Sequence, residues 1–312
     1  MPRQAENREA RTLNVAVVPE DAGAWVKDAV REGGGTLTPV DDAQALVWSG
    51  HGPDGLRKWL DAGVQVTWVQ LPSAGIESYV PLMDDHRTWT CAKGIYGTSV
   101  AEHALALALA GIHGLPHLAR AHSWKRTLCR DLYGGAVTII GGGGIAVRLI
   151  ELLATFDVSI TVVRRHPEEM NGVQTVAPPD RLHDALPEAD AVFLAVALTA
   201  ETRGMIGREE FRKMKSEAWL INVGRGALVR TDDLVVALEE HWIGGAALDV
   251  TAPEPLPADH RLWDLDNCLI TPHCANPPVQ ERKRYAELVA ENVSRRIKGD
   301  PLKGLVDPER GY

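Results

Sequence analysis

The stretch Val137-Thr-Ile-Ile-Gly-Gly-Gly-Gly-Ile-Ala146 joins a short β-branched strand to four glycines and the start of an apolar helix. In such a stretch the first glycine makes a tight turn, the second lets the backbone approach a ligand, and Ala146 keeps the helix close to the sheet. Free N–H groups and the positive end of the helix dipole favour a phosphate there. A plain glycine-rich turn is the alternative, but the strand before and the helix after favour a nucleotide site. The predicted cofactor loop comprises Gly141, Gly143, Gly144, Ile145 and Ala146.

Composition excludes several partners. The chain has 312 residues, enough for two domains, and a net charge of −9, which gives no basic surface for nucleic acid. The longest apolar stretch, 104–112, is too short to span a bilayer, and residues 1–12 are too polar for a secretory signal. No C-x-x-C pair occurs, so free thiols and a cytoplasmic location are expected. The four cysteines are Cys91, Cys129, Cys268 and Cys274.

Strand-like and helix-like stretches alternate along the chain, which predicts parallel sheets with helices on both faces. Expected strands lie at 13–18, 45–48, 64–69, 158–163, 191–197, 219–223, 245–250 and 268–271, and expected helices at 22–31, 55–61 and 279–298. We therefore predict two doubly wound α/β domains. Residues 1–98 and 279–312 would form a flavodoxin-like substrate-binding domain, and residues 99–278 a Rossmann dinucleotide-binding domain inserted in it. A ligand cleft between two such domains is the default expectation.

A helix is also expected to begin at Ser99, because Ser99 and Glu102 fit a capping box. Its alanines and leucines predict deep burial. A little further on, His113 and His117 have a spacing that some metal-binding helices use. Gly114 and Pro116 interrupt that region and no carboxylate partner is evident, so no metal site is predicted.

The residues after the 158–163 strand bear on the choice of cofactor. A Rossmann fingerprint for NAD usually has an acidic residue about 20 positions on, where it binds the ribose 2′-hydroxyl. Here the strand ends in Arg164-Arg165-His166. Two guanidinium groups favour a 2′-phosphate through charge-assisted hydrogen bonds, so NADP(H) is the preferred cofactor and NAD(H) the alternative. The competing interpretation is that both arginines are simply solvated.

Three segments place reactive side chains just past strand ends, where ligands bind in doubly wound sheets. The segments are residues 222–226, 249–257 and 271–275, and they carry Arg225, Glu254 and His273. Each of these residues, taken alone, could equally be a solvated loop residue. Together, in the half of the chain that holds the glycine loop, they predict an active site.

The chain resembles the D-isomer-specific 2-hydroxyacid dehydrogenases over nearly its whole length. The resemblance rests on the helix start at 99–103, the glycine loop, Leu198-Thr-Ala-Glu-Thr202, the 222–226 loop, the Glu254 segment and Pro272-His273. It implies hydride transfer between NAD(P)H and a small 2-keto acid, and a homodimer. A nucleotide-sensing, corepressor-like protein of the same fold is the alternative, because a protein can keep a fold whose site no longer turns over substrate.

The resemblance also implies residue roles that physical chemistry supports. Arg225 would bind the substrate carboxylate and keto oxygen through its planar fork. His273 would donate a proton to the keto oxygen, and Glu254 would bind the far ring nitrogen and favour the protonated ring. With Arg225, the loop Ser73-Ala74-Gly75 would bind substrate. Leu198, Thr202, Val223 and Asp249 would join the cofactor site, Asp249 at the nicotinamide amide.

Overall fold

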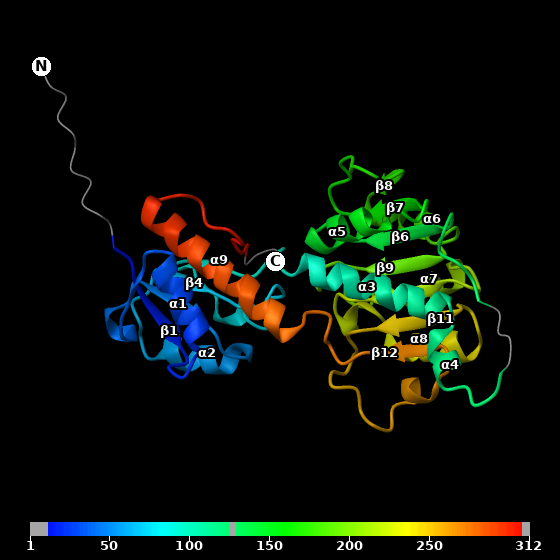
Figure 1. Ribbon diagram of the computed structural model, residues 1–312, viewed down its shortest axis with the longest axis horizontal. Helices are drawn as coiled ribbons and strands as arrows, with labels where there is room; N and C mark the ends of the chain where they lie inside the picture. Colours follow the sequence, from blue (N-terminus) through cyan, green and yellow to red (C-terminus); the bar gives the residue numbers. More distant parts are fainter. Residues whose placement is uncertain (1–11, 125–128, 308–312) are drawn as a thin grey trace, which may run out of the picture. The chain divides into compact units, whose positions relative to one another are not determined.

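The computed structural model describes residues 12–124 and 129–307 and divides the chain into two compact units. The first unit holds the described residues up to Ile95 and those from Pro278 onward, and the second runs from Tyr96 to Pro277. The second unit is therefore inserted into the first along the sequence. Each unit contains one parallel β-sheet with packed helices, as the alternating pattern predicts (Figure 1).

The first unit is built on a five-stranded sheet in the order β2-β1-β3-β4-β5, with every pair parallel. This is the flavodoxin-like order, so the predicted fold class is confirmed here. Helix α1 packs against α9, which brings together elements from the two ends of the sequence. The elements are β1 (Asn14–Val18), α1 (Ala24–Glu32), β2 (Thr36–Leu37), η1 (Val40–Asp42), β3 (Ala45–Trp48), α2 (Gly52–Asp61), β4 (Trp68–Gln70), η2 (Val80–Leu82), β5 (Thr88–Thr90) and α9 (Pro278–Lys298).

Two kinds of expectation fail in this unit. The strand expected at 64–69 begins only at Trp68, because Val64 and Val66 are buried in the core ahead of the strand. Strands β2 and β5 were not expected. They have two and three residues and contain threonines, which is too short for a periodic hydrophobic signal.

The second unit is built on a seven-stranded parallel sheet in the order β12-β11-β10-β9-β6-β7-β8. This is the Rossmann order extended by one strand, so the predicted fold class is confirmed here as well. The strands expected at 191–197 and 245–250 are shorter than expected and end at Leu194 and Leu248. The elements are α3 (Gly97–Ile112), α4 (Leu115–Ala119), β6 (Ala136–Ile140), α5 (Gly144–Leu153), β7 (Ser159–Val163), β8 (Thr175–Ala177), η3 (Pro179–Arg181), α6 (Leu182–Ala185), β9 (Ala191–Leu194), α7 (Arg208–Lys213), β10 (Trp219–Asn222), η4 (Gly226–Leu228), α8 (Thr231–Glu239), β11 (Gly245–Leu248), η5 (Arg261–Asp264) and β12 (Cys268–Ile270).

Side chains of the seven-stranded sheet alternate between two apolar layers. Ile139 and Phe193 pack with residues of α3 and α5 on one face. Ile140 and Leu194 pack with residues of α6, α7 and α8 on the other. Because both faces are covered, these strands are largely apolar, although β6, β7 and β8 also carry threonines. The carboxyl-terminal edge is where their loops are free to carry polar groups.

Helix α3 begins at Gly97, with Tyr96 at its N-cap position, so Ser99 lies inside the first turn. The predicted capping box is therefore wrong. At this start, a Cβ on Gly97 would lie 2.7 Å from the carbonyl oxygen of Gly144, so the backbones of α3 and α5 approach each other closely (Figure 1). The expected deep burial is limited to one face of α3. In the part of the chain that the structure describes, no helix is long and apolar enough to cross a membrane.

The ring of Trp219 lies between two glycines. A Cβ on Gly111 of α3 would come within 2.2 Å of the ring, and one on Gly245 of β11 within 2.5 Å. Trp219 itself is 9% exposed. The close approach of α3 to the sheet therefore depends on the absence of side chains at both positions.

We expect Gly111→Val to lower the free energy of unfolding by about 1–3 kcal/mol, because the new side chain would overpack the Trp219 ring. Urea unfolding followed by circular dichroism measures the change. The control is the same substitution in a Trp219→Leu background, where the smaller side chain leaves room. An equal loss in both backgrounds would show that the ring is not the cause.

Candidate active site

The glycine turn between β6 and α5 has the geometry of a phosphate-binding loop. Gly141 has a φ of +115°, and a Cβ there would lie 2.3 Å from the carbonyl oxygen of Ala195. At Gly143, the N-cap of α5, a Cβ would have no described atom within 4 Å. Ala146 is fully buried against the sheet. The first turn of α5 therefore presents its N–H groups to an open space, and these residues fit the pyrophosphate of a dinucleotide.

Arg164 follows β7 and lies over the glycine turn. A Cβ on Gly142 would lie 2.8 Å from both Cδ and Nε of Arg164. Arg165 forms an ion pair with Glu201, and His166 is exposed. The guanidinium of Arg164 is thus the one directly beside the turn.

The loop after β9 is closed by its threonines. The hydroxyl of Thr202 donates to the carbonyl oxygen of Ala197 at 2.7 Å, and the N–H of Thr199 donates to the same hydroxyl at 2.8 Å. Leu198 packs against the apolar core. Thr202 therefore shapes this loop through local hydrogen bonds.

The loop after β10 carries Arg225 in an extended conformation. The Asn222 amide donates to the Arg225 carbonyl oxygen at 2.9 Å, and Asn222 Oδ1 accepts from the Gly224 N–H at 3.1 Å. Arg225 is half-buried, and its Nη1 donates to the Gly224 carbonyl oxygen at 2.8 Å. Val223 is 7% exposed and contributes to the core. Asn222 thus fixes the backbone that presents the guanidinium.

The loops after β10 and β11 meet at Gly226. A Cβ on Gly226 would lie 1.9 Å from the backbone carbonyl of Thr251, which leaves no space for any side chain. Glu254 is in this second loop and is about half exposed. The segments carrying Arg225 and Glu254 are therefore in direct backbone contact.

His273 follows β12 and forms a short hydrogen bond with Glu254. Nδ1 of His273 lies 2.6 Å from Oε1 of Glu254. A carboxylate without a proton can only accept, so Nδ1 carries the hydrogen of this bond. Nε2 is then the ring nitrogen that takes no part in the bond to Glu254. The side chain of His273 is 51% exposed. The structure thus brings together Glu254 and His273, as the sequence predicts, with Arg225 on the neighbouring loop.

Asp249 is buried at the end of β11 and binds the residues around His273. Its carboxylate accepts from the Thr271 hydroxyl at 2.6 Å and from the N–H groups of Cys274 and Ala275 at 2.9 and 3.1 Å. Burial alone raises the pKa of Asp249, but these bonds and His103 lower it to about 2. Asp249 is therefore an ionised carboxylate inside the protein.

His103 is a residue of this site that the spacing of motifs did not predict. Its Nε2 lies 3.0 Å from the Thr271 hydroxyl oxygen and 3.3 Å from Oδ1 of Asp249. The resemblance named the helix start that contains His103 but gave it no role. Together, His103, Asp249 and Cys274 also offer the donor types of a metal site. The hydrogen bonds already made to Asp249 account for their proximity.

The loop with Ser73, Ala74 and Gly75 belongs to the first unit and follows β4. The Ser73 carbonyl oxygen accepts from the N–H of Ala92 at 2.9 Å, which ties the loop to the segment after β5. Ala74 is exposed. The loop thus lies past the carboxyl end of its own sheet, as expected for a ligand-binding loop.

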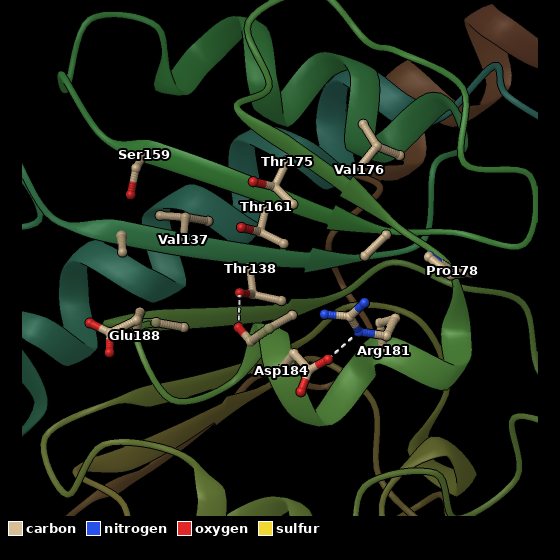
Figure 2. Close-up of a pocket in the computed structure, with 14 residues that line it drawn as sticks. Val137, Thr138, Ser159, Thr161, Thr175, Val176, Pro178, Arg181, Asp184 and Glu188 are labelled. Atoms are coloured by element: carbon tan, nitrogen blue, oxygen red, sulfur yellow. Dashed lines mark hydrogen bonds and ion pairs between the residues drawn. The ribbon is translucent and has the colours of Figure 1, made fainter.

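A separate cavity of about 380 Å³ lies on the other side of the Rossmann sheet from α5. Figure 2 shows Thr138, Thr161 and Thr175 in a row across β6, β7 and β8, with the Arg181–Asp184 ion pair beside them. The Thr138 hydroxyl donates to a backbone carbonyl at 2.6 Å. This cavity is lined by β6, β7 and β8 and by residues of η3, α6 and their flanking segments, and it is distinct from the loops that carry Arg225, Glu254 and His273.

Comparisons with known proteins agree with this geometry. The family model for "D-isomer specific 2-hydroxyacid dehydrogenase, NAD binding domain" matches residues 103–275. A Corynebacterium melassecola protein, described only by its place in the proB 3′ region, is 36% identical over 91% of this chain and 95% of its own. A glyoxylate reductase from Thermofilum pendens is 37% identical over 70% of this chain and 68% of its own. A D-isomer specific 2-hydroxyacid dehydrogenase from Xanthobacter autotrophicus Py2, solved with NADPH and MES, has a TM-score of 0.83 at 26% identity, over 96% of this chain and 99% of that one.

The Rossmann sheet, the glycine turn and the matched family model define a nicotinamide-dependent oxidoreductase. The chain belongs to the D-isomer-specific 2-hydroxyacid dehydrogenases, because the family model covers more than half of it. It is an NAD(P)-dependent dehydrogenase that interconverts 2-keto and 2-hydroxy acids. The family predicted from the sequence is confirmed, and none of these relatives supports the corepressor-like alternative.

The low pKa of Asp249 predicts how its loss affects stability. The folded pKa of about 2 lies below the ordinary value of 3.8, so ionised Asp249 stabilises the fold by about 2 kcal/mol near neutral pH. This contribution is present above the unfolded pKa and is lost as the pH falls through the folded one. We expect Asp249→Asn to lower the free energy of unfolding by about 2 kcal/mol near neutral pH.

Urea unfolding of both proteins from neutral pH down to about pH 3 measures this effect, and the difference between them should shrink on acidification. Asp300→Asn, at an exposed position after α9, is the control and should be neutral. A difference that stays constant with pH would show that Asp249 does not act through its charge.

Proposed function

We propose that the protein reduces a small 2-keto acid to the D-2-hydroxy acid, with His273 as the proton donor. The observation that carries this is the 2.6 Å bond between Nδ1 of His273 and Oε1 of Glu254. This bond fixes the orientation of the ring and leaves Nε2 as the nitrogen that would face a substrate. In the reverse direction the same nitrogen takes up the proton.

His273 and Arg225 have separate functions in this scheme. The reduced nicotinamide, when bound, supplies the hydride that adds to the keto carbon. His273 gives its Nε2 proton to the keto oxygen, so the products are the hydroxy acid and the oxidised cofactor. Arg225 binds the substrate carboxylate and polarises the keto oxygen. Backbone N–H groups of residues 73–75 add donors to the carboxylate.

Glyoxylate is the first substrate to test, because relatives that share about a third of their residues with this chain are glyoxylate reductases. Hydroxypyruvate and larger 2-keto acids are the other candidates. All share the carboxylate and adjacent carbonyl that Arg225 and His273 require. Differences in turnover among them report on the loops around the substrate side chain.

We propose NADP(H) as the preferred cofactor, with NAD(H) as the alternative. Support comes from the position of Arg164 over Gly142, from the adjacent Arg165, and from His166. The Xanthobacter structure contains NADPH. Gly141, Gly143, Gly144, Ile145 and Ala146 would hold the pyrophosphate, while Leu198, Thr202, Val223 and Asp249 would line the remaining cofactor site.

Three further assignments are proposed with this function. Residues 99–278 would be the dinucleotide-binding domain, and residues 1–98 with 279–312 the substrate-binding domain. A homodimer is proposed from the family and from the half-buried leucines of α3. A cytoplasmic location is proposed because all four cysteines are free thiols.

Replacing His273 by alanine should lower kcat for keto acid reduction by about 10²- to 10⁴-fold, because the proton donor is lost. NADPH binding, measured by fluorescence titration, should change little. The assay is NADPH oxidation with a panel of 2-keto acids. His86→Ala, at an exposed histidine of the first unit, is the control and should match the unmodified protein. Full turnover in His273→Ala would end this assignment.

Replacing Arg164 by alanine should raise the KM for NADPH about tenfold and leave that for NADH nearly unchanged, because one charge-assisted bond to the 2′-phosphate disappears. Steady-state kinetics with both cofactors measure the ratio. Arg148→Ala, at an exposed arginine of α5, is the matched control. Equal effects on both cofactors would contradict the proposed preference.

A further inference from the structure

His103, Thr271 and Asp249 form a chain of hydrogen bonds behind the loop that carries His273. The bonds measure 3.0 Å from His103 Nε2 to the Thr271 oxygen and 2.6 Å from that oxygen to Asp249 Oδ1. Asp249 is 2% exposed, and the side chain of His103 is 23% exposed. His103 lies on α3 and Thr271 after β12, so the chain of bonds connects a helix to the active-site loop.

The position of each proton in this chain follows from the acceptors. Asp249 is ionised, so its carboxylate only accepts, and the single hydroxyl proton of Thr271 must point toward it. The Thr271 oxygen can then only accept from the imidazole. Nε2 of His103 therefore carries a hydrogen, and the direction of donation runs from His103 through Thr271 to Asp249.

The same carboxylate sets the backbone around His273. The N–H of His273 donates to the Asp249 carbonyl oxygen at 2.8 Å, and the next two N–H groups donate to the Asp249 carboxylate. His273 has a φ of +50°, a left-handed conformation that is uncommon for residues other than glycine. Rotation of the Asp249 carboxylate would release the N–H groups of Cys274 and Ala275 together.

We propose that His103 is a positioning residue, which acts through Thr271 and Asp249 to hold His273 where it can transfer its proton. This inference rests on the proposed role of His273. His103 orients the Thr271 hydroxyl and lies 3.3 Å from the carboxylate, so it limits rotation of both groups. It need not touch the substrate.

Two substitutions of His103 separate positioning from packing. His103→Gln retains an N–H donor near the same place, whereas His103→Leu keeps the bulk and removes the donor. We expect kcat for keto acid reduction to fall at least about tenfold in His103→Leu and less than about threefold in His103→Gln, because small misplacements of a reacting group slow catalysis steeply. The KM for the keto acid should stay within about twofold in both variants, since its carboxylate binds elsewhere.

Thr271→Val tests the middle of the chain of bonds. It should lower kcat as much as His103→Leu does, because it also interrupts donation to Asp249. The double variant should be no slower than either single one, since both remove the same connection. Losses that multiply in the double variant would overturn the proposal.

Hydrogen–deuterium exchange of the full chain gives a readout that needs no turnover. The N–H groups of Cys274 and Ala275 should exchange at least about tenfold faster in His103→Leu, and at nearly the unmodified rate in His103→Gln. Unmodified exchange and kcat in His103→Leu, with an inactive His273→Ala, would overturn this inference alone. Full activity in His273→Ala would instead remove the proposed function on which it rests.

Discussion

The active site depends on one buried carboxylate. Asp249 has lost its water, which by itself disfavours the charged form, yet it stays ionised because four donors surround it. Two of those donors are the backbone N–H groups just after His273. The buried charge, which would be unfavourable without partners, therefore holds the loop in its conformation. That loop includes the left-handed conformation at His273, whose side chain bonds to Glu254. The backbone around His273 is thus held from inside the sheet edge by Asp249, while its side chain bonds to the half-exposed Glu254.

Most of the fold could be predicted because the buried parallel strands are largely apolar and alternate with helices along the chain. The failures have physical causes. Strands β2 and β5 are too short to show a period, and the 64–69 run is buried without joining the sheet until Trp68. Ser99 and Glu102 fit a capping box, but α3 begins at Gly97, where its backbone closely approaches that of α5. Such contacts involve residues far apart in sequence, which local patterns cannot report.

In the site, too, local features could be predicted and contacts between distant residues could not. Arg225, Glu254 and His273 could be predicted because each follows a strand end, and β10, β11 and β12 are neighbours in the sheet. The His103 contact could not, since its partner Thr271 is 168 residues away and histidine in an apolar helix has no pattern of its own. The role of Asp249 in holding the His273 loop could not be predicted either. Its carboxylate accepts from backbone N–H groups, which nearly every residue has, so the sequence gives no sign of the contact. Sequence reveals side-chain chemistry at strand ends more readily than the bonds that orient it.

The close approach at Gly226 has a consequence for how such an enzyme can diverge. With no room for even a methyl group between the backbones of the 226 and 251 segments, neither loop can shift without displacing the other. The loops that carry Arg225 and Glu254 therefore behave as one rigid piece. We therefore expect substitutions that change the preferred keto acid to lie in other loops, which can move without disturbing this junction.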